Sequence, residues 1–401
     1  MAFENRVLLW MCALVAVNQL GFGAMIPSLP LYAQSFGVPA SAVGIAVAVY
    51  GLARFFTAVP SGRLSDRLGR RPTLAIGGLI SAAGNLWCAV ASSYPEFIIA
   101  RFVAGAGAGL IVTTGQIVLA DITTPERRGR MLALYQGTFI FAVGIGPFPG
   151  GLLAEHYGLS APFWAYGFAA LIVTGIAWIM VGETRDIGRA ASKHMGASLS
   201  FVDQFRLLTG KLGFALISVI VLIGAIVRTG GMFTVIPILA KERLDLSVSS
   251  IGFALMLGSV SGLVAAYPLG WVTDRFGRKA VIVPATVISG SSMLLYCLAP
   301  DYAWFMGASI VWGVAISALG TAPAAYAADS APPGMNAAAM STFRMIADAG
   351  YVAGPLLLGS IVDLLGASAA LSTAAVMIIV SGALFAVFAP ETYRRSAADK
   401  A

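Results

Sequence analysis

Residues 62–71 read GRLSDRLGRR and residues 270–279 read GWVTDRFGRK, so two versions of one ten-residue pattern lie 208 positions apart. Each version has glycine at its first and eighth positions, aspartate at its fifth, and basic residues at its sixth, ninth and tenth. Further pairs keep this separation, or 210 in the last case: Asp121 and Asp329, Pro125 and Pro333, Gly146-Pro147 and Gly354-Pro355, Glu183-Thr184 and Glu391-Thr392, Ile26-Pro27 and Ile236-Pro237. An ordered series of matches across the whole chain indicates an internal duplication, because chance would supply only an isolated pair.

The composition indicates the medium in which the chain folds. Of the 401 residues, 58% are hydrophobic and 11% are charged, whereas globular domains are about 45–50% apolar and about 25% charged. A water-soluble chain of this length needs a polar surface that so few charges cannot supply. The composition therefore argues against a soluble enzyme, a nucleic-acid-binding protein and a disordered chain, and it is typical of a polytopic membrane protein.

The apolar stretches predict about twelve membrane-spanning helices, since a helix needs about 20 residues to cross roughly 30 Å of hydrocarbon. The predicted spans are 7–31, 42–61, 73–92, 96–118, 131–153, 162–181, 211–239, 250–271, 280–299, 302–323, 341–362 and 368–389. Combined with the duplication, they predict an all-α polytopic membrane protein of two pseudo-symmetric six-helix bundles.

One connection is much longer than the others and divides the chain into halves. Residues 182–210 are polar, so we expect an N-terminal six-helix bundle over 1–181, a cytoplasmic linker over 182–210 and a C-terminal six-helix bundle over 211–401. Apolar residues recur in the linker at helical spacing: Phe201, Val202, Phe205 and Leu208. This spacing predicts a short amphipathic helix lying on the membrane surface.

The basic residues predict the orientation. Nineteen of the 25 lysines and arginines fall on one side of the predicted spans, and only Lys241 and Arg243 fall on the other. The positive-inside rule therefore places both termini and the linker in the cytoplasm. We expect the protein in the plasma membrane, which in bacteria is the inner membrane. The net charge of +7 is on this interpretation a signal of topology, and we expect no nucleic-acid partner.

Four motifs carry a resemblance to a known family. The repeated pattern of residues 62–71 resembles the signature loop of the major facilitator superfamily, and Arg101-Phe-Val-Ala-Gly105-Ala-Gly107-Ala-Gly109 resembles a second motif of that family. The fifth span carries Ala142-x-x-x-Gly146-Pro147-x-x-Gly150-Gly151, which is similar to the motif of exporters that exchange substrate for protons. Gly23-x-x-x-Pro27-x-x-Pro30 resembles the twelve-helix drug:proton antiporters in particular. The resemblance covers essentially the whole chain and implies an efflux antiporter.

The repeated loop is the candidate cytoplasmic gate. Its glycines permit a sharp turn between helices, after which Asp66 can face the N-terminus of a neighbouring helix, where free N–H groups favour a carboxylate. The resemblance implies that this neighbour is the eleventh span, that Arg70 reaches Asp121 and that Arg344 lies nearby. The alternative is that these charges only fix the topology.

The duplication predicts a weaker mirror of this gate in the second half. There we expect Asp274 to face the fifth span and Arg278 to reach Asp329. The predicted gate residues of both halves are Gly62, Asp66, Arg67, Gly69, Arg70, Arg71, Asp274, Gly277 and Arg278.

Glycine and proline mark a second pair of sites, in the fifth and eleventh spans. Small residues permit close helix approach, and proline removes a backbone hydrogen bond and bends the helix. We expect the two kinks in the outer half of the membrane, where they would seal the periplasmic mouth; ordinary small-residue packing is the alternative. The residues of this antiporter motif and its repeat are Gly146, Pro147, Gly150, Gly151, Gly354 and Pro355.

Charged residues inside predicted spans are candidates for coupling transport to protons, because an ionised side chain at mid-bilayer costs about 2.5–3.5 kcal/mol and usually faces a cavity or a partner. They are Arg54, Arg101, Arg228, Arg344 and Asp348. Asp348 is the carboxylate among them, although Arg344 lies four residues earlier and a static ion pair is the alternative. Asp121 and Asp329 compete as titrating groups. Arg101 matches a position that the resemblance links to proton handling, and we expect it to organise polar groups and tune a carboxylate, since arginine hardly titrates.

The substrate cavity is predicted between the first, fourth, seventh and tenth spans, with contributions from the fifth and eleventh. Methionine adapts to varied ligands, and aromatic rings stack or engage cations, so such a lining suits flat lipophilic compounds; lipid or helix contacts are the alternative for each aromatic residue. The candidates are Asn18, Gln19, Phe22, Arg54, Gln116, Phe139, Arg228, Met232, Phe233, Trp312 and Tyr351.

Together these patterns predict a secondary active transporter rather than an enzyme. We expect it to export small lipophilic or amphipathic compounds in exchange for protons by alternating access, as a monomer in the lipid bilayer, with no cofactor and no metal. An importer, uniporter or sugar exporter of the same fold that moves a hydrophilic metabolite is the first alternative. A non-transporting membrane protein, such as a receptor or an intramembrane enzyme, is a second, although a receptor has no need of two pseudo-symmetric gates.

Overall fold

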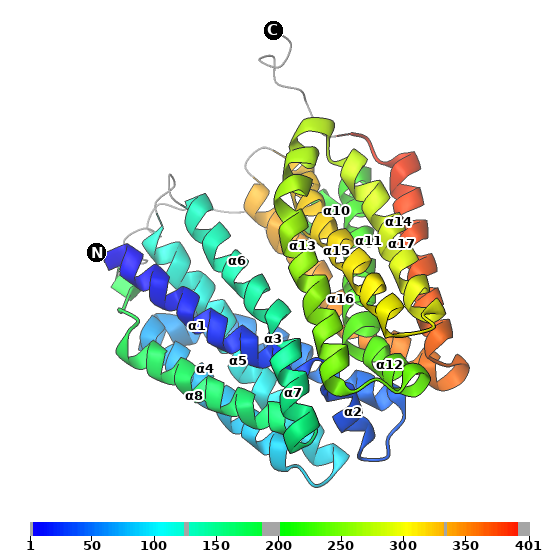
Figure 1. Cartoon of the computed structure of the whole chain (residues 1–401). Coiled ribbons are helices and arrows are strands. Elements are labelled where there is room, and N and C mark those ends of the chain that lie inside the picture. The colour runs from blue at the N-terminus through cyan, green and yellow to red at the C-terminus, as the bar shows by residue number, and fades with distance from the viewer. Residues whose placement is uncertain (1–2, 124–127, 187–200, 333–334, 392–401) are drawn as a thin grey trace. The chain divides into compact units, whose positions relative to one another are not determined.

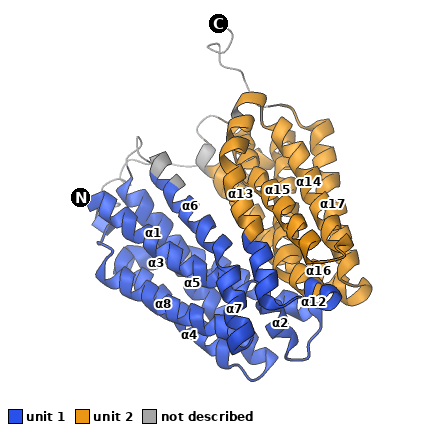
Figure 2. Cartoon of the chain, in the orientation of Figure 1, with its two compact units in different colours: residues 1–197, 240–256 blue, residues 198–239, 257–401 orange. Residues whose placement is uncertain are grey.

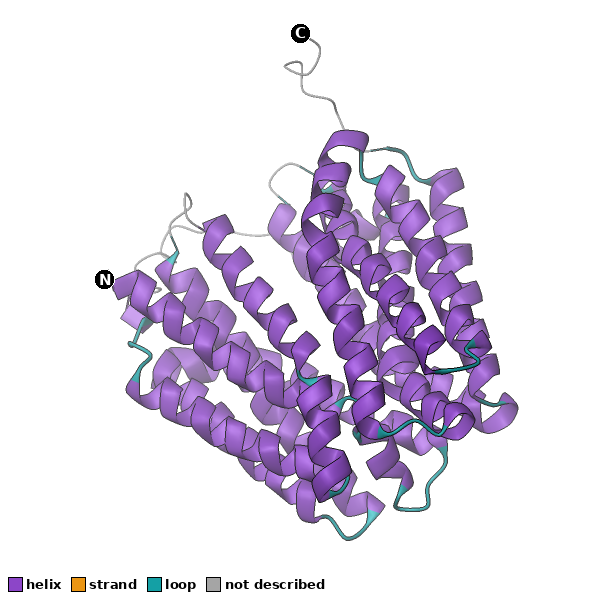
Figure 3. Ribbon diagram, in the orientation of Figure 1, coloured by secondary structure: helices purple, strands orange, loops and turns teal. Residues whose placement is uncertain are grey.

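The computed structural model describes residues 3–123, 128–186, 201–332 and 335–391. Within these ranges the chain is built from helices and the loops between them (Figure 3). Twelve of the described helical segments are long and apolar enough to cross a membrane. The predicted fold class is confirmed: the protein is an all-α polytopic membrane protein.

The first half of the chain forms the first six spans (Figure 1). Their helices are α1 (Phe3–Met25), α2 (Leu29–Gln34), α3 (Ala40–Leu68), α4 (Arg70–Val90), α5 (Tyr94–Ile122), α6 (Arg128–Ile145), α7 (Pro147–Tyr157) and α8 (Ala161–Ile179). The first predicted span, 7–31, is too long at its end, because α1 ends at Met25 and a turn leads into α2. Proline explains the break: Pro30 occupies the first turn of α2, where a missing N–H costs nothing.

The second half forms the remaining spans. Its helices are α10 (Phe201–Thr209), α11 (Leu212–Ile226), η1 (Val227–Val235), α12 (Ile236–Leu244), α13 (Val248–Phe276), α14 (Lys279–Leu298), α15 (Tyr302–Ser330), α16 (Asn336–Leu365) and α17 (Ala367–Phe388). The seventh span is continuous through α11, η1 and α12, but η1 is a π-helix, with the wider i→i+5 hydrogen-bond pattern. Hydropathy does not distinguish this segment from an α-helix.

The chain divides into two compact units (Figure 2). Unit 1 comprises residues 1–197 and 240–256, and unit 2 comprises residues 198–239 and 257–401. The start of α13 therefore belongs to unit 1, although it lies in the second half of the sequence. Residues 187–200 of the predicted linker lie outside the described residues, and its end forms α10, whose Leu208 is buried in the core of unit 2.

Each unit has its own apolar core. In unit 1 one buried cluster is built by α1, α4, α5, α6 and α8, and a second by the end of α1 with α2, α3, α4, α5 and α8. In unit 2 the core is built by α10, α11, α14, α15 and α17 with part of α16. Small residues let α4 and α5 touch: a side-chain carbon added at Gly84 would overlap the backbone of Ala104, and one added at Gly107 would overlap that of Ser81. Such contacts substitute in lipid for the hydrophobic driving force that water supplies elsewhere.

Candidate functional site

The turn between α3 and α4 depends on Gly69. Gly69 has a φ of +108°, a backbone conformation that residues with a Cβ rarely adopt. A Cβ at this position would also collide with the Glu183 carboxylate. Gly62 has no such role, because α3 continues to Leu68 and nothing lies within 4 Å of a Cβ placed there. The expectation that both glycines form the turn is therefore wrong for Gly62.

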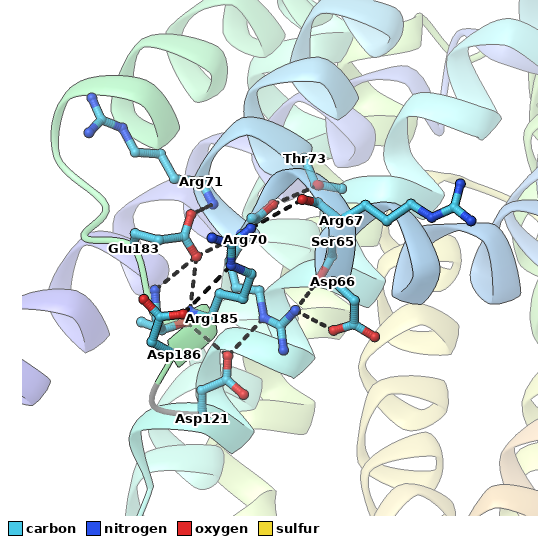
Figure 4. Close-up of polar contacts among 12 residues, drawn as sticks. Ser65, Asp66, Arg67, Arg70, Arg71, Thr73, Asp121, Glu183, Arg185 and Asp186 are labelled. Carbon is cyan, nitrogen blue, oxygen red and sulfur yellow. Dashed lines mark hydrogen bonds and ion pairs between the residues drawn. The ribbon is translucent and has the colours of Figure 1, made fainter. Parts of the chain in front are cut away.

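Arg70, the first residue of α4, joins two carboxylates (Figure 4). Its Nε donates to Asp121 Oδ2 of α5 at 2.9 Å, and its Nη1 donates to Asp66 Oδ1 of α3 at 2.6 Å. Nη1 also donates to Ser65 Oγ at 3.0 Å. The side chains of Arg70 and Asp121 are 6% and 7% exposed, whereas that of Asp66 is 64% exposed. The pair with Asp121 is therefore the better shielded of the two, and it ties the start of α4 to the end of α5.

Glu183, which follows α8, caps the N-terminus of α4 from a distant part of the chain (Figure 4). Its Oε1 accepts hydrogen bonds from the backbone N–H groups of Arg70 at 2.9 Å, Thr184 at 3.0 Å and Arg185 at 2.9 Å, and its Oε2 accepts one from Arg71 at 3.2 Å. Burial raises the pKa of Glu183, but the four N–H donors outweigh burial and hold that pKa below its usual value. The carboxylate thus satisfies N–H groups that the first turn of a helix leaves without partners.

A threonine completes the connection between these groups. Thr184 Oγ1 donates to Asp121 Oδ2 at 2.9 Å, the same oxygen that receives Arg70 Nε. We refer to Asp66, Arg70, Asp121, Glu183 and Thr184 as the α3–α4 charge cluster. It joins the ends of α3, α4 and α5 to the segment that follows α8.

The corresponding residues of unit 2 form a second cluster. Arg278 Nε donates to Asp329 Oδ2 at 2.9 Å, and the backbone N–H of Lys279 donates to Glu391 Oε2 at 3.1 Å. Gly277 makes the turn, with φ of +97°. The Arg278 and Asp329 side chains are 16% and 35% exposed, so this pair is the more open of the two. We refer to Arg278, Lys279, Asp329 and Glu391 as the α13–α14 charge cluster; the side chain of Asp274 lies outside the described residues.

The remaining loop cations contact neighbouring groups in unit 1. The guanidinium of Arg71 lies 5.0 Å from the centre of the Trp178 ring, a cation–π contact. The backbone carbonyl of Arg67 accepts a hydrogen bond from Arg185 Nη1 at 3.1 Å. The expected approach of Asp66 to the eleventh span concerns the two units jointly and stays a prediction.

Glu183 and Glu391 were not among the residues that the sequence predicted for the gate. The signal that identifies them is the repeat itself, since Glu-Thr recurs at the same separation of 208 as the loop. The sequence does not show which helix a glutamate caps when the partners are 113 positions apart.

In the first half, the antiporter motif lies where helices touch backbone to backbone. A Cβ added at Gly146 would lie 2.7 Å from Gly23 Cα of α1, and one added at Gly150 would overlap Ala24. Gly151 faces Val248 at the start of α13, within unit 1. The motif therefore fixes the fifth span against the first span and against the N-terminal end of the eighth.

In unit 2 the corresponding glycine makes a similar contact. A Cβ added at Gly354 would lie 2.6 Å from Ile226 O and 2.7 Å from Thr229 Oγ1. One turn earlier in α16, a Cβ at Gly350 would lie 2.5 Å from Leu222 O. The eleventh span thus packs closely along α11 and η1.

Arg101 is buried in unit 1, with 1% of its surface exposed. Its Nε donates to Ala46 O at 3.1 Å, and its guanidinium lies 4.4 Å from the centre of the Tyr50 ring. The expected carboxylate is not among the described contacts of Arg101. Its positive charge is instead placed over the electron-rich ring of Tyr50, an arrangement that stabilises a desolvated cation.

Tyr50 links Arg101 to the polar residues of α1. Its hydroxyl lies 3.3 Å from the Tyr166 hydroxyl, which donates to Asn18 Oδ1 at 3.3 Å. Asn18 Nδ2 in turn donates to Gln19 Oε1 at 2.8 Å. The structure therefore brings Asn18 and Gln19 into one buried network with Arg101, although through two tyrosines rather than by direct contact.

Asp348 and Arg344 are exposed residues of α16, and no ion pair joins their side chains in the described part of the chain. The static i,i+4 pair is therefore not formed. Arg54 of α3 is half-buried and lies within electrostatic range of Tyr50 and Tyr166. Arg228, in η1, is exposed.

The other candidates for the substrate cavity differ in their surroundings. Phe22 stacks on Tyr50 with 5.5 Å between ring centres, which adds it to the network around Arg101. Phe139 packs against the core of unit 1, which favours a structural role for that residue. The remaining candidates are buried (Met232 and Trp312) or half-buried (Gln116, Phe233 and Tyr351).

Comparison with known proteins identifies the family. The model of the Major Facilitator Superfamily matches residues 11–262 and 221–401. The chain therefore belongs to the Major Facilitator Superfamily, as the repeated loop indicated.

Individual relatives are distant. The chain is 23% identical over 379 residues to an uncharacterized MFS-type transporter of Methanocaldococcus jannaschii, with 94% of this chain and 96% of that protein covered. It is 25% identical over 323 residues to the multidrug resistance protein MdtL of Klebsiella pneumoniae, with 78% and 80% covered. A solved bacterial homologue of the human lysosomal transporter Spinster has a TM-score of 0.78 at 15% identity, with 96% and 97% covered. At this identity the structural match shows the fold alone.

Proposed function

We propose that this transporter exports small lipophilic or amphipathic compounds in exchange for protons, by alternating access. The observation that carries the proposal is the pair of charge clusters at equivalent positions of the two halves. Each joins an arginine at the start of one helix to an aspartate at the end of the next, and each adds a glutamate that caps the same helix start. Export is supported by the antiporter motif and by the similarity to MdtL.

The clusters are suited to act as latches at the cytoplasmic ends of the two halves. An exposed ion pair contributes about 0–1 kcal/mol, which is small enough to be exchanged during a transport cycle. The shielded Arg70–Asp121 pair resists exchange more strongly, because Asp121 would be left partly buried without its cation. We assign Asp66, the exposed partner, to the contact that forms and breaks, and Asp121 to the permanent part of the latch.

Asp348 is the first candidate for the proton-binding group. It lies in the eleventh span, and its side chain makes no ion pair with Arg344. Arg101 has a different role in the proposal, because its contacts to Ala46 and Tyr50 suit an organiser of the polar network. It is not a proton carrier, since arginine stays protonated.

Reconstituted protein tests the proposal. Vesicles with an imposed pH gradient are loaded with ethidium, a flat lipophilic cation, and its movement is followed for the wild type, Asp348→Asn, Arg101→Ala and the exposed control Asp186→Asn. We expect gradient-driven movement in the wild type and the control, movement uncoupled from the gradient in Asp348→Asn, and loss of movement in Arg101→Ala.

Two outcomes would contradict the proposal. Wild-type ethidium movement that does not respond to the pH gradient would exclude proton antiport and favour the alternative, a uniporter or an importer. Transport of a hydrophilic sugar or nucleoside down its gradient would support that alternative. Coupling that is unchanged in Asp348→Asn would remove Asp348 from the mechanism and leave Asp121 and Asp329 as the carboxylates to test.

A further inference from the structure

The eleventh span contains a carbonyl that its own helix cannot satisfy. Pro355 lies inside α16 and has no backbone N–H, so the carbonyl of Tyr351, four residues earlier, has no helical donor. Thr229 of η1 supplies a donor from another helix: its Oγ1 lies 3.2 Å from Tyr351 O. The contact therefore repairs the defect that the proline creates, and it does so between the seventh and eleventh spans.

The same hydroxyl has a second acceptor within its own span. Thr229 Oγ1 lies 2.9 Å from Ala225 O, four residues earlier. A threonine hydroxyl carries one hydrogen, so it donates to one carbonyl at a time or is shared between the two. Thr229 is fully buried, where water does not replace a lost partner. A second acceptor therefore allows the helices to separate without leaving this hydroxyl unsatisfied.

The seventh and eleventh spans can move relative to each other near Thr229 because no side chain lies between their backbones there. A Cβ added at Gly230 would overlap the carbonyl of Gly354, so the two helices meet at their backbones on either side of Thr229. Thr229 also lies in the π-helix, a geometry that is frequent at functional sites. The Thr234 hydroxyl donates to Thr229 O at 3.1 Å, five residues back, which matches the widened turn.

The first half of the chain has the proline but a different neighbour. Pro147 leaves the carbonyl of Val143 without its helical donor in the same way. The group packed against that carbonyl is Gly23 of α1, where an added Cβ would overlap Val143 O. Glycine has no hydroxyl, so the switchable donor is a feature of the second half.

We propose that Thr229 is a positioning residue that transfers its hydrogen bond between Tyr351 and Ala225 as the seventh and eleventh spans move, and that this transfer sets the rate of a conformational step in transport. Both arrangements keep the hydroxyl bonded, and they differ in that Tyr351 O has the threonine donor only in the first. Losing that donor carries the cost of one buried hydrogen bond, a gap within the range of free energies that separates the states of a two-state element. The transport consequence rests on the alternating-access function proposed above. The hydrogen bond between the two spans does not, and it is measured separately.

A double-mutant cycle tests the contact. Thr229→Val keeps the shape of the side chain and removes the hydroxyl, and Thr229→Ser keeps the hydroxyl. Pro355→Ala restores a backbone N–H to α16, so Tyr351 O regains a donor and the contact from Thr229 becomes redundant. Thr373→Val is the matched control, because Thr373 Oγ1 bonds the i−4 carbonyl of Ala369 at 2.9 Å within α17.

The first readout is ethidium transport in vesicles. Thr229→Val is expected to change the turnover rate by about threefold, the effect of one interhelical hydrogen bond in a membrane protein, with KM unchanged. Thr229→Ser is expected to restore the wild-type rate, and Thr373→Val to leave it unchanged. In the Pro355→Ala background the further change Thr229→Val is expected to have no effect on the rate.

The second readout is the apparent melting temperature of the same purified proteins in detergent, which needs no substrate. Non-additive effects of Thr229→Val and Pro355→Ala on melting temperature, which we call coupling, support the hydrogen bond if Thr373→Val and Pro355→Ala show additive effects. This conclusion holds even if ethidium is not transported. Additive effects in the melting experiment would overturn the inference, whatever the vesicles show. Coupling in melting temperature with additive effects on turnover would overturn the assignment to the transport step. Ethidium movement that ignores the pH gradient would instead contradict the proposed antiport and leave the contact standing.

Discussion

Replacing Glu183 by glutamine is the most direct test of the α3–α4 charge cluster. The carboxylate accepts four backbone N–H groups, three at Oε1 and one at Oε2. A glutamine side chain has the same shape and can keep its carbonyl oxygen at the Oε1 position. Its NH2 group must then replace Oε2, where it faces the N–H of Arg71, donor against donor.

The expected loss follows from these contacts. A hydrogen bond to a charged group contributes about 1.5–3 kcal/mol when shielded, and a charge near an exposed helix N-terminus about 0.3–1 kcal/mol. Glu183 is an exposed residue, so we expect Glu183→Gln to cost about 1 kcal/mol at pH 7. For a unit of this size that corresponds to a fall of about 2–4 °C in melting temperature.

The pH dependence has a definite sign. The pKa of Glu183 is lower in the folded protein than its usual value, so its stabilising contribution is fully present above about pH 4.3. It is lost as the pH falls through the folded-state pKa, because the protonated side chain no longer prefers the folded state. The difference in melting temperature between wild type and Glu183→Gln is therefore expected in full at pH 7 and should be smaller at about pH 4, below the usual pKa of a glutamate.

The measurement is thermal unfolding of purified protein in detergent at both pH values. Asp186→Asn is the matched control, since it removes the same charge three residues later from a side chain that is 85% exposed. Equal melting temperatures for wild type and Glu183→Gln at pH 7, or a loss equally large in Asp186→Asn, would refute the capping role of Glu183.

Five further substitutions have expected outcomes. Gly69→Ala should cost about 1–3 kcal/mol, because φ of 108° and ψ of 163° lie in a region essentially restricted to glycine. Gly62→Ala, in open space within a helix, should stabilise by about 0.5–1 kcal/mol; equal effects in thermal unfolding would argue against the turn. Gly150→Val should abolish folding or transport because it separates α7 from α1, and Gly175→Val, with nothing within 4 Å, should be tolerated in expression and transport assays. Arg101→Lys retains the charge but loses the planar stacking on the tyrosine ring, so transport should fall severalfold; wild-type transport would show that charge alone suffices.

The sequence predicted the pairs within the charge clusters better than their caps. Arg70 with Asp121 was expected because the family resemblance implied it, and Arg278 with Asp329 because the duplication carried that pair to the second half. Glu183 was visible only as a repeated dipeptide, since nothing local shows that a residue after α8 reaches the start of α4. Sequence spacing also permitted an Arg344–Asp348 pair that the two side chains do not make.

Local chemistry explains two errors in the predicted helices. The first span was extended to residue 31 because its apolar character continues through Pro27 and Pro30, whereas the prolines end α1 and begin α2. Gly62 was assigned to a turn because glycine favours turns, but the residues that follow it continue α3 as far as Leu68. In both cases hydropathy and residue type gave the approximate region, and backbone hydrogen bonding decided the boundary.

Hydropathy, helix length and the 208-residue repeat are properties of the chain alone, and they determined that this protein is a twelve-helix transporter built from two related halves. Only the tertiary structure decided three other features. They are the environment of Arg101, the helix caps formed by Glu183 and Glu391, and the hydrogen bond from Thr229 to the Tyr351 carbonyl. The physical reason is that these groups satisfy polar atoms whose need arises locally, at a helix start or a proline, but whose partners lie on other helices. Sequence shows where a hydrogen bond is missing, and only packing shows which side chain supplies it.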